Sequence, residues 1–569
     1  MPTFEAMSFL RRETKRGHTY LSICENYRDE AGKVQRRLLH NLGNVNKFTP
    51  EAIERIGRQL IELVKGPDIA AITDIKEVSR HNYGFPVVIH RLLCIYSLDI
   101  VLHRIARNYK LGYSLAQHVS LMLCDRLNDP LSKLGSYNLQ NNYVGLGEPV
   151  TLQHLYRTLD HLATCNQLIQ THIYNKHANL FNYEFDVVFY DVTTFYFDSD
   201  VVEEGKLRQM GFGKDGKIGK TQILFSLLID KNKVPIGFQI FKGDKYEGHT
   251  FKEAIKTLKE KYRINRIIVV ADSGMLNNDN LNLFDEGMDA DGYEYIVGDR
   301  LKSLSETAVA HLTNMKNYKP LKLKDTNDHA ANNKDGKEQK TKEGQPDVKE
   351  EDKSLLYCTY KYGKRTIICT WSEKRAKKDK AERDEKILKA QKLLKTPALI
   401  ERKAKTYFLK PTTDNQQYIL DTAKIELQTK FDGFKAIATN AADITPETVL
   451  EKYSELYKIE HSFRSFKSYL ETRPMFHWTD KRIEGHLVLC YISFCMLNYL
   501  QQYTGYTEQT IRRALDKTQV SKIIMDQELS WLRSEMSEEA GKIFEAINIK
   551  QLPNVIKDKD ISNYMPSNL

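Results

Sequence analysis

The sequence predicts a mixed α/β protein with more than one domain. In the middle of the chain, short apolar runs alternate with amphipathic helical segments. This alternation is typical of strands packed against helices. Long helical patterns lie before and after that middle part. The chain has 569 residues, more than one hydrophobic core usually organises, so we expect about two to four domains.

Composition indicates a soluble, intracellular protein with an anionic partner. Hydrophobic residues make up 41% of the chain, and 85 Lys and Arg residues outnumber 75 Asp and Glu residues, giving a net charge of +10. This mildly basic balance favours nucleic acid as a partner, although many ordinary soluble proteins share it. The 8 cysteines include no CxxC pair, which favours free thiols in a reducing compartment. We find neither a signal peptide nor an apolar run approaching the ~20 residues of a membrane helix.

Residues 1–48 predict a basic N-terminal β-hairpin, because basic and apolar residues alternate on either side of Gly32. Thr49 and Pro50 then suit the first positions of a helix. The pattern stays mostly helical over residues 49–180. A basic, helical region of this kind is a candidate for DNA recognition, but it is also typical of a structural scaffold.

Residues 183–299 predict three strands, a helix, a strand, a helix and a strand. That is the order of an RNase H-like fold, whose mixed sheet gathers carboxylates from its first and fourth strands. Asp191 lies inside the first predicted strand, and Asp272 directly follows the fourth. The expected strands are Asp186–Phe197, Gln222–Ile229, Pro235–Phe241, Arg266–Ala271 and Tyr293–Val297, and the expected helices are Thr250–Tyr262 and a short one near Leu281.

The segment 300–444 predicts a β-rich insertion domain that interrupts this fold. Its residues 322–353 are almost wholly polar and predict a flexible loop, because they cannot bury enough apolar surface to become ordered. Residues 445–500 are expected to complete the RNase H-like fold, and residues 501–569 to form a helical C-terminal tail. Within the insertion we expect strands at Leu356–Tyr360, Arg365–Trp371, Tyr407–Lys410 and Phe434–Thr439, and a charged helix over Arg375–Leu394.

One helix, from Thr445 to Leu470, carries a third acidic residue of interest. At about 100° per residue, one apolar stripe and one polar stripe run side by side along it. The polar stripe alone also fits a solvated row of ion pairs, since two of its members are spaced i, i+4. The apolar stripe is Leu456, Ile459, Phe463, Phe466 and Leu470, and the polar stripe is Tyr453, Glu460, Arg464 and Lys467.

The three acidic residues Asp191, Asp272 and Glu460 are unusual, because carboxylates rarely lie against a core without an opposite charge or a metal ion. If the fold brings them together, their oxygens can hold divalent cations such as Mg²⁺. We therefore interpret them as a candidate site for metal-dependent phosphodiester chemistry. The histidines offer no competing site, because the sequence has no HExxH motif and no Cys/His cluster.

These segments together resemble the DDE transposases of bacterial insertion sequences, in the branch typified by insertion sequence four. The signature of that branch is Tyr-x₂-Arg-x₃-Glu-x₆-Lys, and it reads Tyr453-x₂-Leu456-x₃-Glu460-x₆-Lys467 here. Leu456 replaces the Arg, and Arg464, one turn beyond Glu460, is the candidate substitute. The other shared motifs, in order, are Asp191-Val192-Thr193-Thr194, Gly211-Phe212-Gly213-Lys214-Asp215-Gly216, Gly243-Asp244-x₂-Glu247, Ala271-Asp272-Ser273-Gly274 and Arg473-Pro474.

This resemblance implies a DNA transposase that binds the terminal inverted repeats of an insertion sequence, cleaves DNA and transfers strands into target DNA. Asp191, Asp272 and Glu460 would be its catalytic residues and the ligands of two Mg²⁺ or Mn²⁺ ions. Tyr453 and Lys467 would lie near a DNA phosphate. The implied partners are double-stranded DNA, at transposon ends and target, and a second copy of the chain on that DNA. The implied location is the bacterial cytoplasm, at the nucleoid when DNA is bound, and no membrane is involved.

Two alternatives stay open. A nuclease of the same fold that cleaves without strand transfer would keep all three acids, whereas a non-catalytic DNA-binding descendant should have lost at least one. In the Gly-rich segment that precedes residue 221, Lys214, Lys217 and Lys220 fit either a DNA contact or a charged hairpin. Trp371 follows an apolar strand and fits packing better than stacking on a DNA base.

Overall fold

The computed structural model describes residues 7–15, 17–29, 32–45, 48–49, 52, 54–55, 57–58, 75–181, 187–198, 201–202, 205–211, 220–262, 267–272, 293–321, 355–395, 407–412, 418–473, 475–525 and 528–565. The expected helix near Leu281, the loop over 322–353, and Lys214 and Lys217 lie outside the described residues. The chain divides into two compact units, Met1–Ser79 with Ser521–Leu532, and Arg80–Val520 with Arg533–Leu569.

The N-terminal part of the first unit is an antiparallel sheet of β1 (Met7–Lys15), β2 (His18–Arg28) and β3 (Val34–Asn44). The expected hairpin about Gly32 corresponds to β2 and β3, and β1 is an additional strand. Lys15 pairs with His18 across the first turn. Gly17 has φ +79° and Gly32 has φ +75°, so a residue without a Cβ stands in each turn where the chain reverses.

The helical part of the second unit is assembled around a helix from much later in the sequence. α16 (Asp480–Thr504) packs against α5 and α7. Its length and mean hydropathy of 1.3 would suit a membrane span, as would the pair α3 and α4, which is bent by 81°. This corrects the expectation that no apolar run is long enough. However, 94% of the apolar window of α16 is buried inside the protein, as in a core helix. The earlier elements are α3 (Gly84–Tyr96), α4 (Leu98–Asn108), α5 (Leu115–Asn128), α6 (Lys133–Asn138), η2 (Gln140–Asn142), α7 (Leu152–Thr164) and α8 (Asn166–Phe181).

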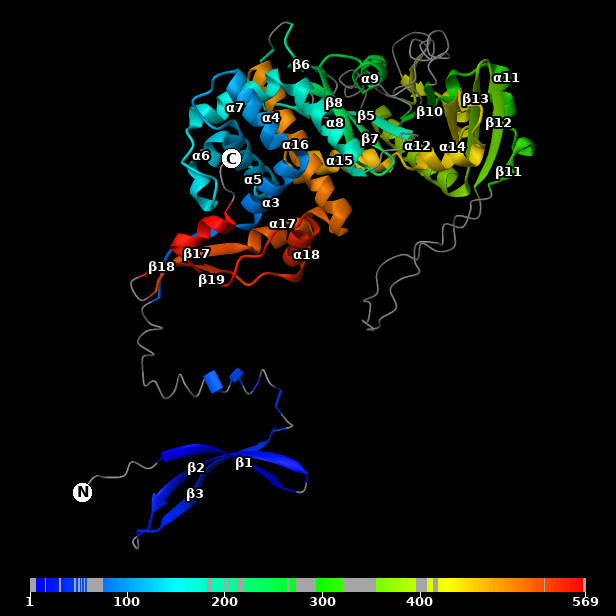
Figure 1. Ribbon diagram of the computed structural model, residues 1–569. Helices are drawn as coiled ribbons and strands as arrows, with labels where there is room; N and C mark the ends of the chain where they lie inside the picture. Colours follow the sequence, from blue (N-terminus) through cyan, green and yellow to red (C-terminus); the bar gives the residue numbers. More distant parts are fainter. Residues whose placement is uncertain are drawn as a thin grey trace. The chain divides into compact units, whose positions relative to one another are not determined.

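A large mixed sheet carries both aspartates of interest (Figure 1). Its first strands lie in the order β8–β7–β5–β9–β10, and they follow one another along the chain in the predicted order of three strands, a helix and a strand. β5, β9 and β10 run parallel, and β7 is antiparallel to β5 and β8. The elements are β5 (Val187–Tyr196), β6 (Gln209–Met210), β7 (Thr221–Asp230), β8 (Pro235–Lys242), α9 (Glu247–Tyr262), β9 (Ile267–Ala271) and β10 (Tyr293–Asp299).

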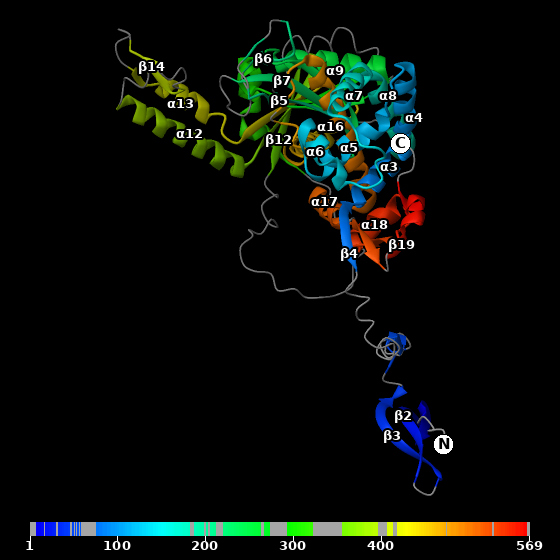
Figure 2. The same cartoon turned by 90° about the vertical axis from the view of Figure 1, so that its left-hand side faces the viewer.

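The segment expected to be a separate insertion domain instead continues this sheet, because β16 pairs with β10 and then with β13. The order runs on as β10–β16–β13–β12–β11. The part from α12 to α13 projects away from the sheet (Figure 2). The elements are η4 (Leu301–Ser303), α11 (Glu306–Leu312), η5 (Met315–Asn317), β11 (Lys319–Pro320), β12 (Leu356–Tyr362), β13 (Arg365–Trp371), α12 (Glu373–Leu394), β14 (Leu409–Pro411), β15 (Tyr418–Leu420), α13 (Thr422–Thr429) and β16 (Phe434–Thr439).

The two faces of the sheet are covered by different helices. Residues of α9 and α11, among them Phe251 and Leu312, share a core with β5, β9 and β10. The expected helix from Thr445 to Leu470 packs on the other face, but it is not continuous. It consists of α14 (Pro446–Ser454), α15 (Tyr457–Arg464) and a π-helical turn, η8 (Ser465–Tyr469).

The C-terminal region differs from the expected helical tail, because strands alternate with its helices. In the sheet order, β4 (Lys76–Asn82) is next to β17 (Gln519–Met525), and β17 is next to β18 (Glu528–Arg533). Val520 and Ile523 of β17 are buried. The remaining elements are α17 (Glu508–Lys517), α18 (Glu538–Ala546), β19 (Val555–Lys557) and η9 (Asp558–Tyr564).

Candidate active site

Asp191 and Asp272 lie on neighbouring parallel strands. The register of β5 and β9 pairs Val188 with Val269 and Phe189 with Val270. Continued two residues past its last pair, the same offset sets Asp191 level with Asp272. Asp191 is half-buried within β5, and Asp272 is exposed directly after the end of β9. The sheet therefore brings together two carboxylates that are 81 positions apart in the sequence.

The alternation of side chains along β5 sets the face on which Asp191 lies. The Tyr190 hydroxyl donates to Thr250 Oγ1 of α9 at 2.7 Å, so Asp191 belongs to the opposite face. Phe189 shares that face, and the Lys458 ammonium of α15 lies 5.8 Å from its ring centroid. Because α15 packs against β5 and β7, Asp191 lies on the face covered by the helix that carries Glu460.

Glu460 and Asp272 act on the same two neighbours, Tyr453 and Lys435. Burial raises the pKa of Tyr453. The Asp272 carboxylate accepts a hydrogen bond from the Tyr453 hydroxyl and raises this pKa further, and the Glu460 carboxylate does so too. Burial and the Arg375 guanidinium lower the pKa of Lys435, while Asp272 and Glu460 raise it. The Lys435 ammonium also lies 4.4 Å from the centroid of the Tyr453 ring. Both carboxylates therefore face one shared polar cluster.

Lys435 and Arg375 are site residues that the sequence analysis missed. Lys435 lies on β16 and Arg375 in the first turn of α12. The one signal for Lys435 is a lysine within an otherwise apolar strand, Phe434-Lys435-Ala436-Ile437-Ala438. Arg375 gives no such signal, because α12 is charged throughout its length.

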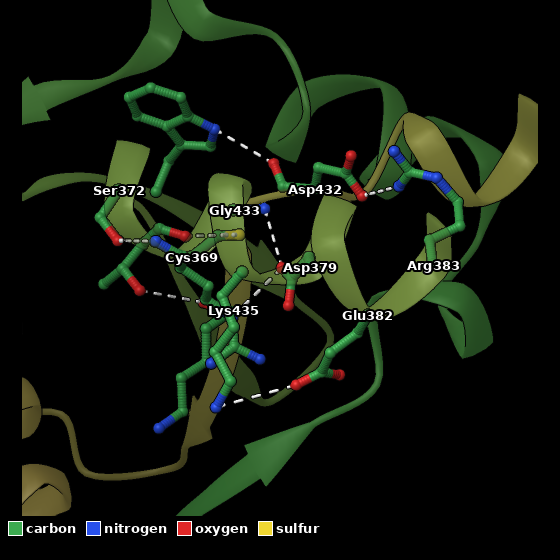
Figure 3. Close-up of polar contacts among 12 residues, drawn as sticks. Cys369, Ser372, Asp379, Glu382, Arg383, Asp432, Gly433 and Lys435 are labelled. Carbon is green, nitrogen blue, oxygen red and sulfur yellow. Dashed lines mark hydrogen bonds and ion pairs between the residues drawn. The ribbon is translucent and has the colours of Figure 1, made fainter. Parts of the chain in front are cut away.

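The start of α12 is fastened to the loop before β16 (Figure 3). The Gly433 amide donates to Asp379 Oδ2 at 3.0 Å, and the Trp371 indole donates to the Asp432 carbonyl at 3.2 Å. Arg383 forms an ion pair with Asp432. These contacts fix the helix turn that carries Arg375 relative to the strand that carries Lys435. Trp371 is engaged in this packing, in agreement with its predicted role.

Three other basic residues, Arg464, Lys467 and Lys220, were predicted to contact DNA. Arg464 is exposed at the end of α15, and Lys467 is half-buried within η8. In the part of the chain that the structure describes, Glu460 and Arg464 form no ion pair, so the i, i+4 pair allowed by the sequence is not made. Lys220 is half-buried just before β7.

The donor set suits a hard divalent cation, since all three acids offer carboxylate oxygens. Asp191 corresponds to Asp272 two residues beyond the last pair of the β5–β9 register, and Glu460 and Asp272 act electrostatically on the same two side chains. Among the described residues, no group of three or more His, Cys, Asp or Glu side chains is already arranged to hold a metal ion. The Lys435 ammonium instead supplies a positive charge beside Asp272 and Glu460. The three carboxylates thus have the chemistry to bind a divalent metal ion. They are not grouped closely enough in this structure to count as a metal-binding cluster.

Comparison with known protein families decides the class of the protein. The model of the transposase DDE domain matches residues 183–496, more than half of the chain. The chain belongs to the DDE transposase family. Asp191, Asp272 and Glu460 all lie within the matched residues. A second model, the N-terminal domain of IS1634 family transposases, matches residues 10–68 of this DDE transposase. The predicted membership among insertion-sequence transposases is therefore confirmed, and the finer assignment to the branch of insertion sequence four stays a prediction.

Comparisons with individual proteins add two distant structures. No curated protein matches the sequence. The DDE transposase is similar to the piggyBac transposase in a synaptic complex with hairpin DNA, with 10% identity and a TM-score of 0.34 over 76% of this chain and 80% of that one. It is also similar to the Mos1 transposase in a paired-end complex with the left transposon end, with 11% identity and a TM-score of 0.14 over 31% of this chain and 57% of that one.

Proposed function

We propose that this DDE transposase binds the terminal inverted repeats of an insertion sequence, cleaves DNA at their ends and transfers the cut strand into target DNA. The observation that carries this proposal is the placement of Asp191 on the sheet face covered by the helix of Glu460. Asp191 corresponds to Asp272 two residues beyond the last pair of the β5–β9 register, and Asp272 and Glu460 both act on Tyr453 and Lys435. The family match supplies the reaction class.

Asp191, Asp272 and Glu460 would hold two Mg²⁺ or Mn²⁺ ions, which supply Lewis-acid activation of a water and later of the freed 3′-hydroxyl. The chain's own residues prepare the site for these ligands. The Tyr453 hydroxyl donates to the Asp272 carboxylate and so fixes its orientation. Lys435 and Arg375 offset the repulsion between converging carboxylates, which would otherwise favour their protonation.

Contact with DNA is proposed for the basic residues around this site. Arg464 and Lys467 lie on the elements that follow Glu460, and Lys220 lies at the start of β7. Lys214 and Lys217, outside the described residues, belong to the same proposal.

We further propose that two copies of the chain act together on DNA in the bacterial cytoplasm. A nuclease without strand transfer, or a DNA-binding protein without catalysis, are the outcomes against which the proposal is tested.

The test uses the full chain, Mg²⁺ or Mn²⁺, and a labelled duplex carrying the terminal inverted repeat that flanks its gene. We expect nicking and joining by the wild type, and roughly 10³-fold or greater loss of both in Asp191→Asn, Asp272→Asn and Glu460→Gln, with DNA binding kept. Glu451→Gln, at an exposed position of α14, is the matched control and should react as the wild type does. Nicking without joining would identify a nuclease. Binding without metal-dependent cleavage would refute the catalytic proposal.

A further inference from the structure

A polar cavity lies elsewhere in the protein, and its lining includes none of the three carboxylates. It has a volume of about 120 Å³, close to what a phosphate group with one or two waters needs. The segment after the Glu460 helix forms one wall with Glu471, Arg473, Met475, Phe476 and His477, and α5, α6, α7 and α16 supply the others. The lining includes Arg126, Lys133, Tyr156, Arg473, His477 and His486.

Arg126 and Lys133, two basic residues of the lining, are both buried, and the Asp125 carboxyl acts on both of them. Arg126 is 5% exposed and Lys133 is 3% exposed. Within the described residues neither forms an ion pair, and Arg126 Nε is buried with no hydrogen-bond partner. Arg126 Nη1 donates to the Leu470 carbonyl at 2.9 Å, so the hydrogen bond that it makes there is to a neutral group. A buried polar atom without a partner indicates a missing ligand, ion or water.

Electrostatics in the cavity agree with this geometry. Burial, followed by the Arg126 guanidinium, lowers the pKa of Lys133 to about 7, and the Asp125 carboxyl offsets this only in part. Burial raises the pKa of Asp125 itself, so its negative charge is disfavoured too. Glu471 is the acidic residue of the lining and is exposed. The cavity thus favours an anion, because burying two like charges together is costly until a counter-charge enters.

Two aromatic side chains stand exposed beside the cavity. Phe476, which lines it, is 68% exposed, and Trp478 is 62% exposed. The Arg208 guanidinium lies 4.7 Å from the Trp478 ring and 5.4 Å from the Phe197 ring, so it holds one side of the indole in place. Exposed aromatic rings next to cations are typical of surfaces on which nucleic-acid bases stack.

The same segment is attached to the strand that carries Asp191. Met475 forms a bridge with Phe197, directly after β5, and the Arg473 guanidinium lies 5.4 Å from the Tyr196 ring. Asp191 precedes Tyr196 by five positions on β5, which corresponds to roughly 16 Å along an extended strand. A nucleic-acid strand that reaches the carboxylates can therefore reach the cavity within a few nucleotides.

We propose that the cavity between Arg126, Lys133, Arg473 and residues 475–477 binds a phosphate group of DNA, with Phe476 and Trp478 against the adjoining nucleotide. The inference rests on the proposed function, since it makes the ligand a phosphate of the DNA being processed. The phosphate accepts hydrogen bonds from Arg126 Nε and the Lys133 ammonium and provides a counter-charge. It anchors the DNA at a point separate from the carboxylates and the basic residues around them.

A first experiment measures anion binding without DNA. The melting temperature of the full chain is compared in sodium phosphate and in sodium chloride at equal ionic strength. We expect phosphate to stabilise the wild type and Lys481→Met, a control that removes an exposed lysine of α16. Lys133→Met should lose this stabilisation while remaining folded, because an apolar side chain replaces a buried charge. Equal phosphate stabilisation in Lys133→Met and the wild type would overturn the proposal.

A second experiment locates the phosphate on DNA. Terminal-repeat duplexes each carry one neutral methylphosphonate, moved stepwise along the strand, and a further pair carries a 5′-phosphate or a 5′-hydroxyl. We expect one of these changes to weaken binding by the wild type about tenfold or more, and to have no effect on Lys133→Met. An internal position identifies a backbone phosphate, and the 5′ pair identifies a terminal one. An interference pattern identical in both proteins would contradict the proposal.

These outcomes are distinguishable from failure of the proposed function. The carboxylate variants should bind with the wild-type interference pattern and not nick, whereas Lys133→Met should lose one position of that pattern. Phe476→Ala provides a second variant, because its side chain is exposed and its removal leaves the fold intact. It should weaken binding to a duplex with an unpaired terminal base more than binding to a fully paired one, and equal effects on both would remove the aromatic contact from the proposal.

Discussion

Tyr453 interacts with two of the three carboxylates. Its hydroxyl donates a hydrogen bond to Asp272, and the negative charge of Glu460 raises its pKa. We expect Tyr453→Phe to raise the Mn²⁺ concentration needed for half-maximal nicking by about 10- to 100-fold, the range found when a residue that orients a metal ligand is removed. The matched control is Tyr457→Phe, at a position that is 57% exposed. An unchanged metal requirement in Tyr453→Phe would show that Asp272 is oriented by other groups.

Lys133 should make stability depend on pH. Its pKa is about 7 in the folded protein, against the ordinary 10.5, so between these values the unfolded chain binds more protons than the folded one. The free energy of unfolding therefore rises with pH through that window. Burial is the largest cause and Arg126 also lowers this pKa, whereas Asp125 and Cys490 raise it by less.

The variant Lys133→Met removes this contribution. We expect it to be more stable than the wild type in urea at pH 7, with the difference shrinking as the pH approaches 10. The exposed Lys481→Met should follow the wild-type profile. A constant difference between Lys133→Met and the wild type across this range would show that Lys133 is not buried as a costly cation.

At the scale of single residues, the sequence identified those site residues that end or interrupt a local pattern. Asp191 and Asp272 were found because each follows or breaks an apolar strand, and Glu460 because a spacing of 3.6 residues reveals a polar stripe. Lys435 and Arg375 were not found. Lys435 acts with Asp272 and Glu460 only because β16 joins the sheet beside β10, and Arg375 acts in turn on Lys435. Long-range strand pairing leaves no periodic signal in the sequence.

At the scale of elements, the close packing of α12 against the loop before β16 requires a glycine at position 433. Gly433 has φ +85°, and a Cβ there would lie 2.6 Å from Trp371 Nε1 and 2.9 Å from the Ala376 Cβ. We expect Gly433→Ala to cost about 1–2 kcal/mol in backbone strain and a further ~1–3 kcal/mol in overpacking, measured by urea unfolding. Because α12 must shift to relieve the contact, Arg375 should move and nicking should fall.

The matched control for this substitution is Gly363→Ala. Gly363 has φ +63° in the turn between β12 and β13, and nothing lies within 4 Å of its added Cβ. It should therefore show the backbone cost alone. Equal destabilisation of the two variants would mean that the contact between Gly433 and α12 contributes nothing.

Boundaries of elements were predicted less well than their existence, for physical reasons that differ from case to case. The helix over 445–470 has no internal Pro or Gly, yet it divides after Ser454. In the structure, Lys458 Nζ donates to the Lys231 carbonyl at 2.8 Å, and Ser465 donates to Glu508. These contacts come from distant parts of the chain, so the local pattern could not predict the division or the π-helical turn.

For the whole molecule, α16 joins the helical part of the second unit to the sheet, because it contacts α5, α7 and α8 as well as β8. This arrangement predicts that the two parts unfold together. Gly485 lies where α16 meets α7, and a Cβ at that position would lie 2.0 Å from the Leu159 carbonyl oxygen. The backbone of α7 can yield only if the helices separate, so the contact cannot be relieved by rotating a side chain.

We therefore expect Gly485→Ala to destabilise the protein by about 3 kcal/mol or more, although alanine favours the helical state over glycine by about 1 kcal/mol. Gly541→Ala in α18 is the opposite case, because the one contact of its Cβ is Gln551 Nε2 at 3.8 Å. It should stabilise by up to ~1 kcal/mol. In Gly485→Ala, hydrogen exchange should increase in peptides of α7 and of β8 together. An increase confined to α7 would show that the helical part and the sheet unfold independently.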